Sequence, residues 1–352
     1  MKKHNFFAGP AILPAPVLKQ AAAAVTDFEG MGLSILEISH RSKQFVAVME
    51  EAEALVRELL EVNDDYAVLF LTGGASSEFY LTAMNLLNED ETAGYIDTGA
   101  WSAKAIKEAK HFGKVEVIAS SKDQNYNYIP QDIEVPSGLK YVHITSNNTI
   151  FGTQFKEWPQ TDAPLVADMS SDIFSRRLPL EKFGVIYAGA QKNMGPAGVT
   201  LVIVRKDLLG KVQREIPTML DYRTHIAKGS SFNTPPVYPI YVSMLTMRWV
   251  KENGGVAAME KINAAKAQLL YDEIDRNPKF EATVAKGTGR SLMNVCFLPT
   301  NPDDLEPFVK AASEAGCVGI TGHRSVGGFR ASIYNAMPIE SVQVLVDVMK
   351  NF

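Results

Sequence analysis

Short apolar runs alternate with longer helical patterns along much of the chain. The helical pattern is clearest from Gln44 to Val62, where apolar residues recur at steps of three and four and Ser42 can cap the helix. The apolar runs have the length of buried strands; they span residues 67–71, 93–96, 115–118, 141–144, 165–167, 185–188 and 199–204. Further helices are expected at residues 77–87 and 103–111. The alternation predicts an α/β fold with a mostly parallel sheet flanked by helices.

The pattern changes near residue 255. A long helical pattern follows, then a strand-like run and two more helices; they cover residues 256–275, 291–298, 304–315 and the segment from Ile339 onward. These elements predict a smaller α+β domain at residues 256–352, beside a large domain at residues 16–255. Residues 1–15 contain prolines and are expected to form an extended arm that packs with the small domain.

The composition narrows the class of protein. A chain of 352 residues with 46% hydrophobic side chains suits two domains with a sizeable core. The net charge of −5 does not indicate the basic surface that binds nucleic acid. No apolar run approaches the roughly 18 residues that a membrane helix needs. The prolines near the N-terminus make a poor signal-peptide core. Cys296 and Cys317 lack paired ligand spacing, so we expect a cytoplasmic protein without a metal site or a disulfide.

Several chemically capable residues follow the predicted strands, where open parallel sheets bind their ligands. Lys192 lies in a small-residue loop between two buried strands, where desolvation lowers the pKa of its ammonium group. Asp168 ends another strand and needs a cationic or hydrogen-bonding partner. Trp101 begins a helix, and the loop from Gly73 to Ser76 could cradle a phosphate at a helix N-terminus.

Each of these residues also has an ordinary structural interpretation. A single loop lysine is usually a solvated surface charge, and a glycine pair after a strand is usually a turn. Asp168 could cap a helix, and Trp101 could belong to the core. Together, however, the four features meet the needs of pyridoxal 5'-phosphate: a phosphate cradle, an aromatic ring face, a carboxylate for the ring nitrogen and a lysine for the aldehyde.

Five separated motifs carry a resemblance to a known family. They occur in the family's order, and the match runs from about Asn5 to the C-terminus; they are Asn5–Pro10, Glu37–Arg41, Tyr187–Gly198, Asn233–Pro236 and Gly322–Ala336. The chain resembles the phosphoserine aminotransferases, which belong to the class V group of fold-type I pyridoxal phosphate enzymes. One alternative is another class V enzyme, either an alanine-glyoxylate type transaminase or a cysteine desulfurase, which needs a nucleophilic thiol on a mobile loop. The other is a cofactor-binding regulatory module without catalysis.

The resemblance implies a cofactor site. Lys192 resembles the Schiff-base lysine, Asp168 the partner of the pyridine nitrogen and Trp101 the residue stacked on the ring. The other implied cofactor contacts are Ala75, Ser76, Thr149, Gln191, Asn233 and Thr234. Asn233 and Thr234 resemble a pair that reaches the cofactor phosphate from the neighbouring subunit, which implies a homodimer with shared active sites.

The resemblance also implies substrates with two anionic groups. L-Glutamate has two carboxylates, and 3-phosphohydroxypyruvate has a carboxylate and a phosphate, so guanidinium groups are suitable binding partners. Arg330 resembles the α-carboxylate clamp. The residues that resemble the distal-anion site are His40, Arg41, His323 and Arg324. Of these, His40 and Arg41 resemble residues that come across the dimer interface. The implied products are O-phospho-L-serine and 2-oxoglutarate in serine biosynthesis, with 4-phosphohydroxy-L-threonine formation in pyridoxal phosphate biosynthesis as a second role.

Two positions depart from the family pattern. Ser76 stands where members often carry an arginine or cysteine, which removes one candidate anion contact. Ala8 stands where a serine is often found near the substrate. We therefore expect the distal anion to depend more on Arg41, His323 and Arg324.

Overall fold

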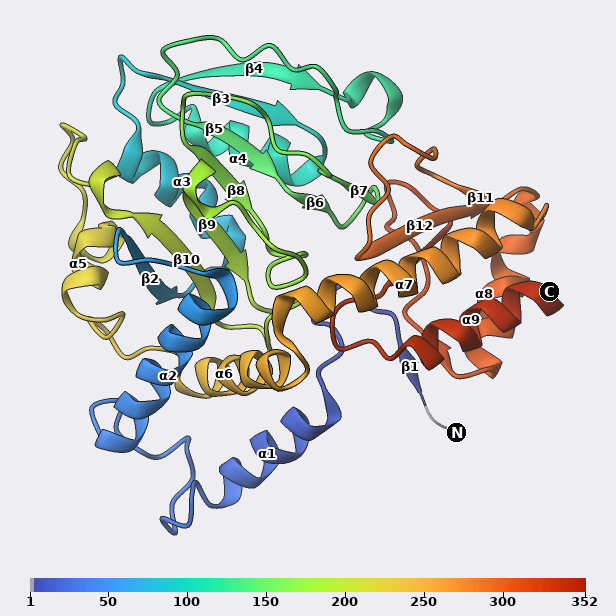
Figure 1. Cartoon of the computed structure of the whole chain (residues 1–352), viewed down its shortest axis with the longest axis horizontal. Coiled ribbons are helices and arrows are strands. Elements are labelled where there is room, and N and C mark those ends of the chain that lie inside the picture. The colour runs from blue at the N-terminus through green and yellow to red at the C-terminus, as the bar shows by residue number, and fades with distance from the viewer. Residues whose placement is uncertain (1–2) are drawn as a thin grey trace.

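The structure is a computed structural model that describes residues 3–352, and it places all seven predicted apolar runs in one sheet (Figure 1). The strands are β2 (Tyr66–Leu71), β3 (Thr92–Asp97), β4 (Lys114–Ser120), β5 (Val142–Thr145), β8 (Leu165–Asp168), β9 (Phe183–Gly189) and β10 (Thr200–Arg205). Their order is β2-β10-β9-β8-β5-β3-β4. β10 runs antiparallel to β2 and β9, and all other neighbouring strands of the sheet are parallel to each other. The predicted mostly parallel sheet is confirmed.

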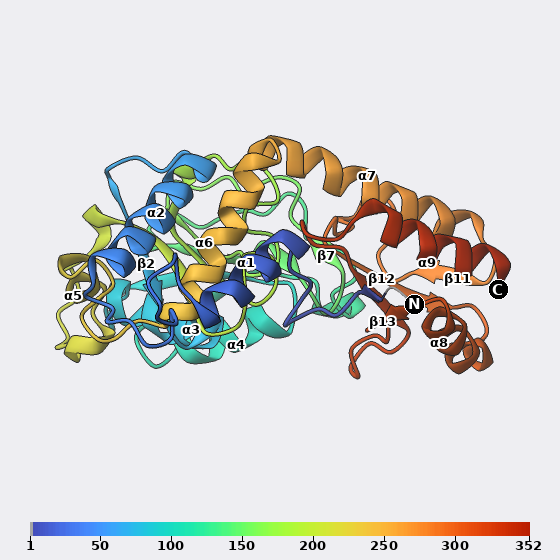
Figure 2. The ribbon, with the colours of Figure 1, turned by 90° about the horizontal axis from the view of Figure 1, so that it is seen from below.

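Helices cover both faces of this sheet (Figures 1 and 2). One face packs against α1 (Ala15–Thr26), α2 (Lys43–Leu60) and α6 (Val237–Glu252), and the other against α3 (Gly74–Leu86) and α4 (Ala100–Ala109). Along β9 the side chains alternate, with Ile186 in the first cluster and Tyr187 in the second. Because both faces are covered, the carboxyl-end edge of the sheet is the part left open for a ligand.

The C-terminal elements form a separate hydrophobic cluster. It contains α7 (Gly255–Arg276), α8 (Leu305–Glu314) and α9 (Ile339–Asn351), with an antiparallel sheet of β11 (Phe280–Ala282), β12 (Asn294–Pro299) and β14 (Phe329–Ser332). The N-terminal arm lies beside them (Figure 2): β1 (His4–Asn5) pairs with β13 (Cys317–Val318), and Phe6 is buried in the cluster. The division into domains near residue 255 stays a prediction.

The remaining short elements connect these parts. They are the two-residue strands β6 (Asn147–Asn148) and β7 (Thr153–Gln154) and the helix α5 (Tyr222–Ala227). The sequence pattern did not predict α1 or α6. Most of α6 is buried all round from Ile240 to Met247, so it shows no amphipathic stripe. Within residues 3–352, no helix combines the length and apolar character that a membrane span needs.

One expected boundary near the site was wrong. The sequence predicted a helix from Ser77, whereas α3 begins at Gly74, so Ala75 and Ser76 lie in its first turn and not in a loop. Gly73 adopts the left-handed region with φ of 101°, and a Cβ there would lie 1.8 Å from Ser77 Oγ. Because glycine allows this tight turn, the helix starts directly after the strand.

Candidate active site

The ends of the sheet strands bring most of the predicted site residues together. Asp168 is the last residue of β8, Lys192 follows β9, and Trp101 lies in the first turn of α4 after β3. A cavity of about 330 Å³ lies at this edge. The predicted residues that line it are Ala75, Ser76, Trp101, Thr149, Asp168, Gln191, Lys192, His323 and Arg330.

Lys192 is the central amine of the cavity. Its Nζ donates a hydrogen bond of 2.7 Å to Thr149 Oγ1 and lies 5.4 Å from the centroid of the Trp101 ring. Burial lowers the pKa of Lys192 to about 8, with the charge of Arg330 acting in the same direction and that of Asp168 opposing it. About a tenth of the amine is therefore neutral, and hence nucleophilic, at pH 7, far more than at the ordinary pKa of a lysine.

The N-terminal arm packs against the loop that carries Lys192. The backbone N–H of Ala11 donates to Gln191 O at 2.9 Å. Gly9 approaches so closely that a Cβ there would lie 3.3 Å from Lys192 Cγ. Ala8 and Gly9 also line the cavity. The arm thus forms one wall of the site, although its sequence carries no charged or nucleophilic group at these positions.

Asp168 is held by a residue that sequence reasoning did not assign to the site. Its Oδ1 accepts hydrogen bonds from the Ser170 N–H at 2.9 Å and from Ser170 Oγ at 2.7 Å. Burial raises the pKa of Asp168, while Lys192 and the Ser170 bonds oppose the shift. Ser170 also lines the cavity. Its position two residues after a strand-ending carboxylate was the available signal.

The start of α3 offers an anion site beside these groups. No side chain caps the N-terminus of α3 in the described chain, and Ala75 and Ser76 of its first turn line the cavity. The N–H of Gly74 is already used, since it donates to Thr200 Oγ1 at 2.8 Å. Free amides and the positive end of the helix dipole favour a bound phosphate at this point.

Arg330 and His323 also line the cavity, and further cationic side chains lie near them. Arg330 Nη1 donates to Thr149 O at 3.2 Å, and Arg330 Nε is buried without a hydrogen-bond partner among residues 3–352. Burial lowers the pKa of His323, as do the charges of Arg330, Arg324 and Lys104. Lys104 was missed by the sequence analysis; its Nζ lies 4.5 Å from the Trp101 ring centroid. An unpartnered guanidinium N–H in a cationic wall is suited to a carboxylate.

Five predicted residues do not line this cavity in the single chain. Arg41, Asn233, Thr234 and Arg324 are exposed. His40 is half-buried, and its Nε2 has no hydrogen-bond partner in the described part of the chain. Asn233 instead lines a different cavity, beside Tyr80. Four of the five (His40, Arg41, Asn233 and Thr234) are the residues for which the sequence implied a contribution across a subunit interface.

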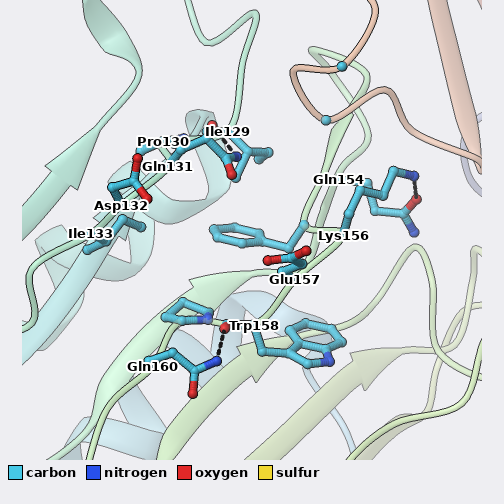
Figure 3. Close-up of a pocket in the computed structure, with 14 residues that line it drawn as sticks. Ile129, Pro130, Gln131, Asp132, Ile133, Gln154, Lys156, Glu157, Trp158 and Gln160 are labelled. Carbon is cyan, nitrogen blue, oxygen red and sulfur yellow. Dashed lines mark hydrogen bonds between the residues drawn. The ribbon is translucent and has the colours of Figure 1, made fainter.

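A second cavity, of about 380 Å³, contains none of the predicted site residues (Figure 3). The polar groups there largely satisfy one another. Lys156 Nζ donates to Gln154 Oε1 at 2.9 Å, and Gln131 Nε2 donates to Ile129 O at 3.0 Å. Burial lowers the pKa of Lys156 to about 8, the same value as for Lys192. Asp132, Glu157 and Trp158 also line this cavity, but it does not lie at the carboxyl ends of the sheet strands where Asp168 and Trp101 meet Lys192.

Glu78 is a buried acid in α3, two residues after Ser76. It is fully buried, and Tyr222 OH donates to its Oε2 at 2.5 Å, while its Oε1 has no partner among the described residues. Burial raises the pKa of Glu78 to about 8, although the Tyr222 bond opposes the shift. The neutral acid is thus the favoured form in the folded protein near neutral pH.

This raised pKa predicts a pH-dependent stability difference for Glu78→Gln. The folded protein holds a proton on Glu78 that the unfolded chain releases between about pH 4.5 and 8, so the wild type loses stability as pH rises through that window. Glutamine does not titrate. Urea unfolding should show similar stabilities at pH 5 and a more stable variant at pH 8, by up to a few kcal/mol at about 1.4 kcal/mol per pKa unit. A difference independent of pH would contradict the prediction.

Comparison with known proteins supplies the family context. The family model for class-V aminotransferases matches residues 4–345. The phosphoserine aminotransferase of Flavobacterium psychrophilum is 60% identical over 351 residues, covering 99% of this chain and 98% of that protein. That of Parabacteroides distasonis is 59% identical over 354 residues, covering 100% and 99%.

Solved structures agree with this context. The phosphoserine aminotransferase from Bacillus circulans subsp. alkalophilus superposes with a TM-score of 0.96 at 46% identity, covering 99% of this chain and 98% of its own. A phosphoserine aminotransferase studied for radiation damage of its Schiff base has a TM-score of 0.96 at 48% identity, covering 100% and 99%. An alanine-glyoxylate aminotransferase from Nostoc has a TM-score of 0.76 at 14% identity, covering 100% and 96%, and thus shares the fold.

Proposed function

The chain belongs to the class-V aminotransferase family and, within it, to the phosphoserine aminotransferases, and we propose that it transfers the amino group of L-glutamate to 3-phosphohydroxypyruvate. The products are O-phospho-L-serine and 2-oxoglutarate, formed in a reversible ping-pong reaction in serine biosynthesis. The observation that carries the proposal is the single cavity that joins the Lys192 amine of lowered pKa to the unpartnered guanidinium N–H of Arg330. One group suits a carbonyl carbon, the other a substrate carboxylate.

Pyridoxal 5'-phosphate is the proposed cofactor, and the residues fit it. Lys192 would hold its aldehyde through the side-chain amine, and the start of α3 with Gln191 would hold its phosphate. The hydrogen bonds that the Asp168 carboxylate accepts within residues 3–352 both go to Oδ1, so Oδ2 would be left for the pyridine nitrogen. Trp101 would contact the ring face, and Thr149 would bind near the ring oxygen. When bound, the cofactor supplies an electron sink for the pair released with the substrate α proton.

Residues of the chain then bind the substrate and move the proton. Arg330 holds the α-carboxylate and so fixes the substrate α carbon beside Lys192. Lys192 accepts the α proton as a neutral amine and returns it as an ammonium, for which a pKa of about 8 is well placed. His323 and Arg324 supply positive charge for the distal carboxylate of glutamate or the phosphate of the acceptor. The same anion pair is present in 3-hydroxy-2-oxo-4-phosphonooxybutanoate, a second acceptor whose product is 4-phosphohydroxy-L-threonine.

We also propose that the active enzyme is a cytoplasmic homodimer with shared sites. The exposed Asn233 and Thr234 reach the phosphate of the neighbouring subunit, and His40 and Arg41 reach its distal-anion site. Arg41, Asn233 and Thr234 are exposed and His40 is half-buried, and all four lie outside the cavity of their own chain, which supports this assignment. The large domain at residues 16–255 carries the cofactor, and the small domain at residues 256–352 carries Arg330 and His323.

The cysteine desulfurase alternative needs a reactive thiolate. Cys296 and Cys317 are both buried, and burial raises their pKa values to about 12 and about 11. Neither thiol lines the cavity that contains Lys192. Both remain protonated thiols near neutral pH, which makes them poor nucleophiles.

A half-reaction tests the proposed function. L-Glutamate should convert the absorbance of the cofactor-loaded protein to that of the pyridoxamine form. 3-Phosphohydroxypyruvate should restore it, and hydroxypyruvate without the phosphate should restore it poorly. Equal restoration by both acceptors would overturn the phosphate-site assignment. Absence of any conversion would favour a cofactor-binding module without catalysis.

Arg41→Ala tests the distal-anion site. If Arg41 binds the acceptor phosphate, its loss should raise the KM for 3-phosphohydroxypyruvate about tenfold or more, since a charge-assisted hydrogen bond contributes about 1.5–3 kcal/mol. Affinity for the cofactor should be unchanged, as measured by titration of the apoprotein. The opposite pattern, with weakened cofactor binding and an unchanged KM, would place Arg41 at the cofactor instead.

A further inference from the structure

Three buried asparagines connect the segments that carry Lys192, Asp168 and Arg330. Asn193, Asn335 and Asn263 are 6%, 4% and 1% exposed. Asn193 follows Lys192 directly, Asn335 lies five residues after Arg330, and Asn263 belongs to α7. None of the three lines the cavity. We call this group the asparagine cluster.

We propose that Asn335 is a positioning residue, which through the asparagine cluster fixes the carboxylate clamp Arg330 relative to Lys192 and Asp168. This inference rests on the proposed function, because it concerns the alignment of the substrate carboxylate with the amine that moves the proton. Asn335 contacts none of the reacting groups in this role. It acts through the backbone segments that it ties together.

The first tie leads to the lysine segment. The backbone N–H of Asn335 donates to Asn193 Oδ1 at 2.9 Å, and Asn193 Nδ2 donates to Ile173 O at 2.5 Å. The side chain next to Lys192 therefore bonds on one side to the Arg330 segment and on the other to the segment after Asp168. Both polar ends of the Asn193 amide are used, so this residue cannot turn without breaking a buried hydrogen bond.

The second tie leads to the aspartate segment. Asn335 Nδ2 donates to Phe174 O at 2.9 Å. Phe174 has a φ of 59°, a left-handed conformation that is unfavourable for a side chain of this size. The segment from Asp168 to Phe174 thus needs external restraint, and the carboxamide of Asn335 supplies one of its bonds.

The third tie leads to α7, which extends from α6 toward the C-terminal elements (Figures 1 and 2). Asn263 Nδ2 donates to Asn335 Oδ1 at 2.8 Å, and Lys266 Nζ donates to the neighbouring Tyr334 O at 2.6 Å. Tyr334 OH in turn donates to Ala8 O at 2.7 Å, in the cavity wall. Buried polar groups are unfavourable when unpaired, so these bonds favour one arrangement of the three segments.

Asn335→Ala tests the proposal, because alanine removes the ties to Phe174 and Asn263 and keeps the backbone N–H. We expect kcat/KM for both half-reactions to fall about 100-fold, because a substrate misplaced by about 1 Å reacts about that much more slowly. The rates are measured per cofactor-loaded site and well below the unfolding temperature. The dissociation constant of glutarate, a dicarboxylate that cannot react, should rise about tenfold. Absorbance of the cofactor should still show a Schiff base with Lys192.

Asn277→Ala is the matched control. Its side chain makes the same kinds of bond, to Glu273 Oε1 at 3.0 Å and Met349 O at 2.9 Å, but away from the cavity. It should lose stability and keep kcat/KM and glutarate binding within about twofold of the wild type. Asn335 is merely structural if Asn335→Ala lowers stability to a similar extent with unchanged kinetics, or if Asn277→Ala lowers kcat/KM equally.

If Asn335→Ala does not fold, Asn193→Ala is the second test, because this substitution removes the acceptor for the Asn335 N–H. The same kinetic loss is then expected, and wild-type kinetics would overturn the proposal. Failure of the wild type to transaminate would be a failure of the proposed function, and is seen separately from either variant.

Discussion

Lys192→Ala should abolish turnover, with kcat/KM lower by about four orders of magnitude or more, as for other covalent nucleophiles that also transfer a proton. The lysine is the group in the cavity that combines a lowered pKa, a hydrogen bond to Thr149 and proximity to the Trp101 ring. Alanine would remove both the amine proposed for the Schiff base and the proposed proton carrier. Single-turnover absorbance with L-glutamate measures the loss directly.

The fold should survive this change. Among residues 3–352, the side chain of Lys192 makes one hydrogen bond, to Thr149 Oγ1, and its loop is held through the Gln191 carbonyl and the Asn193 side chain. Thermal unfolding should therefore remain cooperative, with a midpoint close to that of the wild type. Wild-type activity in a folded variant would place the Schiff base on another lysine.

Lys156→Ala is the matched control for Lys192→Ala. Burial lowers the pKa of Lys156 to about 8 as well, but Lys156 lies in the second cavity (Figure 3) and bonds to Gln154. We expect this variant to keep turnover within about threefold of the wild type, the size of effect usual for a change away from the reacting groups. The comparison separates a lowered pKa from a catalytic position: the lysine must also lie with the carboxylate, the ring face and the anion sites.

The sheet was predictable because each strand carries its own signal. Six of the seven are buried apolar runs that composition and length reveal, and the edge strand β4, which has no buried residue, was found from its short apolar run. Their order and direction then placed Asp168, Lys192 and Trp101 at one edge, as the rule for open parallel sheets predicts. The helix α6 was not predicted, because a helix that is buried on all sides shows no periodic alternation of apolar and polar residues.

The parts of the site that were missed depend on tertiary contacts. Lys104 reads as an ordinary surface lysine until the fold brings α4 close to His323, whose pKa is lowered by burial and by the charge of Lys104. Asn193, Asn263 and Asn335 are scattered over more than 140 residues, and only the packing of α7 against the large sheet's loops makes them neighbours. Asparagines in loops usually indicate turns, so their sequence context offered no sign of a shared role.

The second large effect is expected for Asp168→Asn, which should lower kcat about 100-fold to 1,000-fold by analogy with other single electrostatic groups in active sites. Asparagine can still accept the two Ser170 hydrogen bonds through its Oδ1, so the geometry is kept. What is lost is the negative charge that would keep a pyridine nitrogen protonated. Stopped-flow measurement of the glutamate half-reaction isolates this step from product release.

The variant should also change Lys192 in a defined direction. The charge of Asp168 raises the pKa of Lys192 and partly opposes the effect of burial, so removing that charge should lower the pKa further below about 8. A pH series of reductive methylation on the apoprotein would report this shift without any turnover. An unchanged or raised pKa would mean that Asp168 does not act electrostatically on the lysine.

Asp97→Asn separates the role of Asp168 from that of any buried acid at a strand end. Asp97 is the last residue of β3, is 9% exposed, and accepts from Ser102 Oγ at 3.0 Å and Tyr126 OH at 3.2 Å. It does not line the cavity. Its substitution should lower stability by about 1–3 kcal/mol, the usual effect of weakening buried hydrogen bonds to a charged group, and leave kcat within about threefold. Equal loss of activity in the two variants would mean that Asp168 has no special electrostatic role, because the loss of any buried carboxylate at a strand end would then have the same effect.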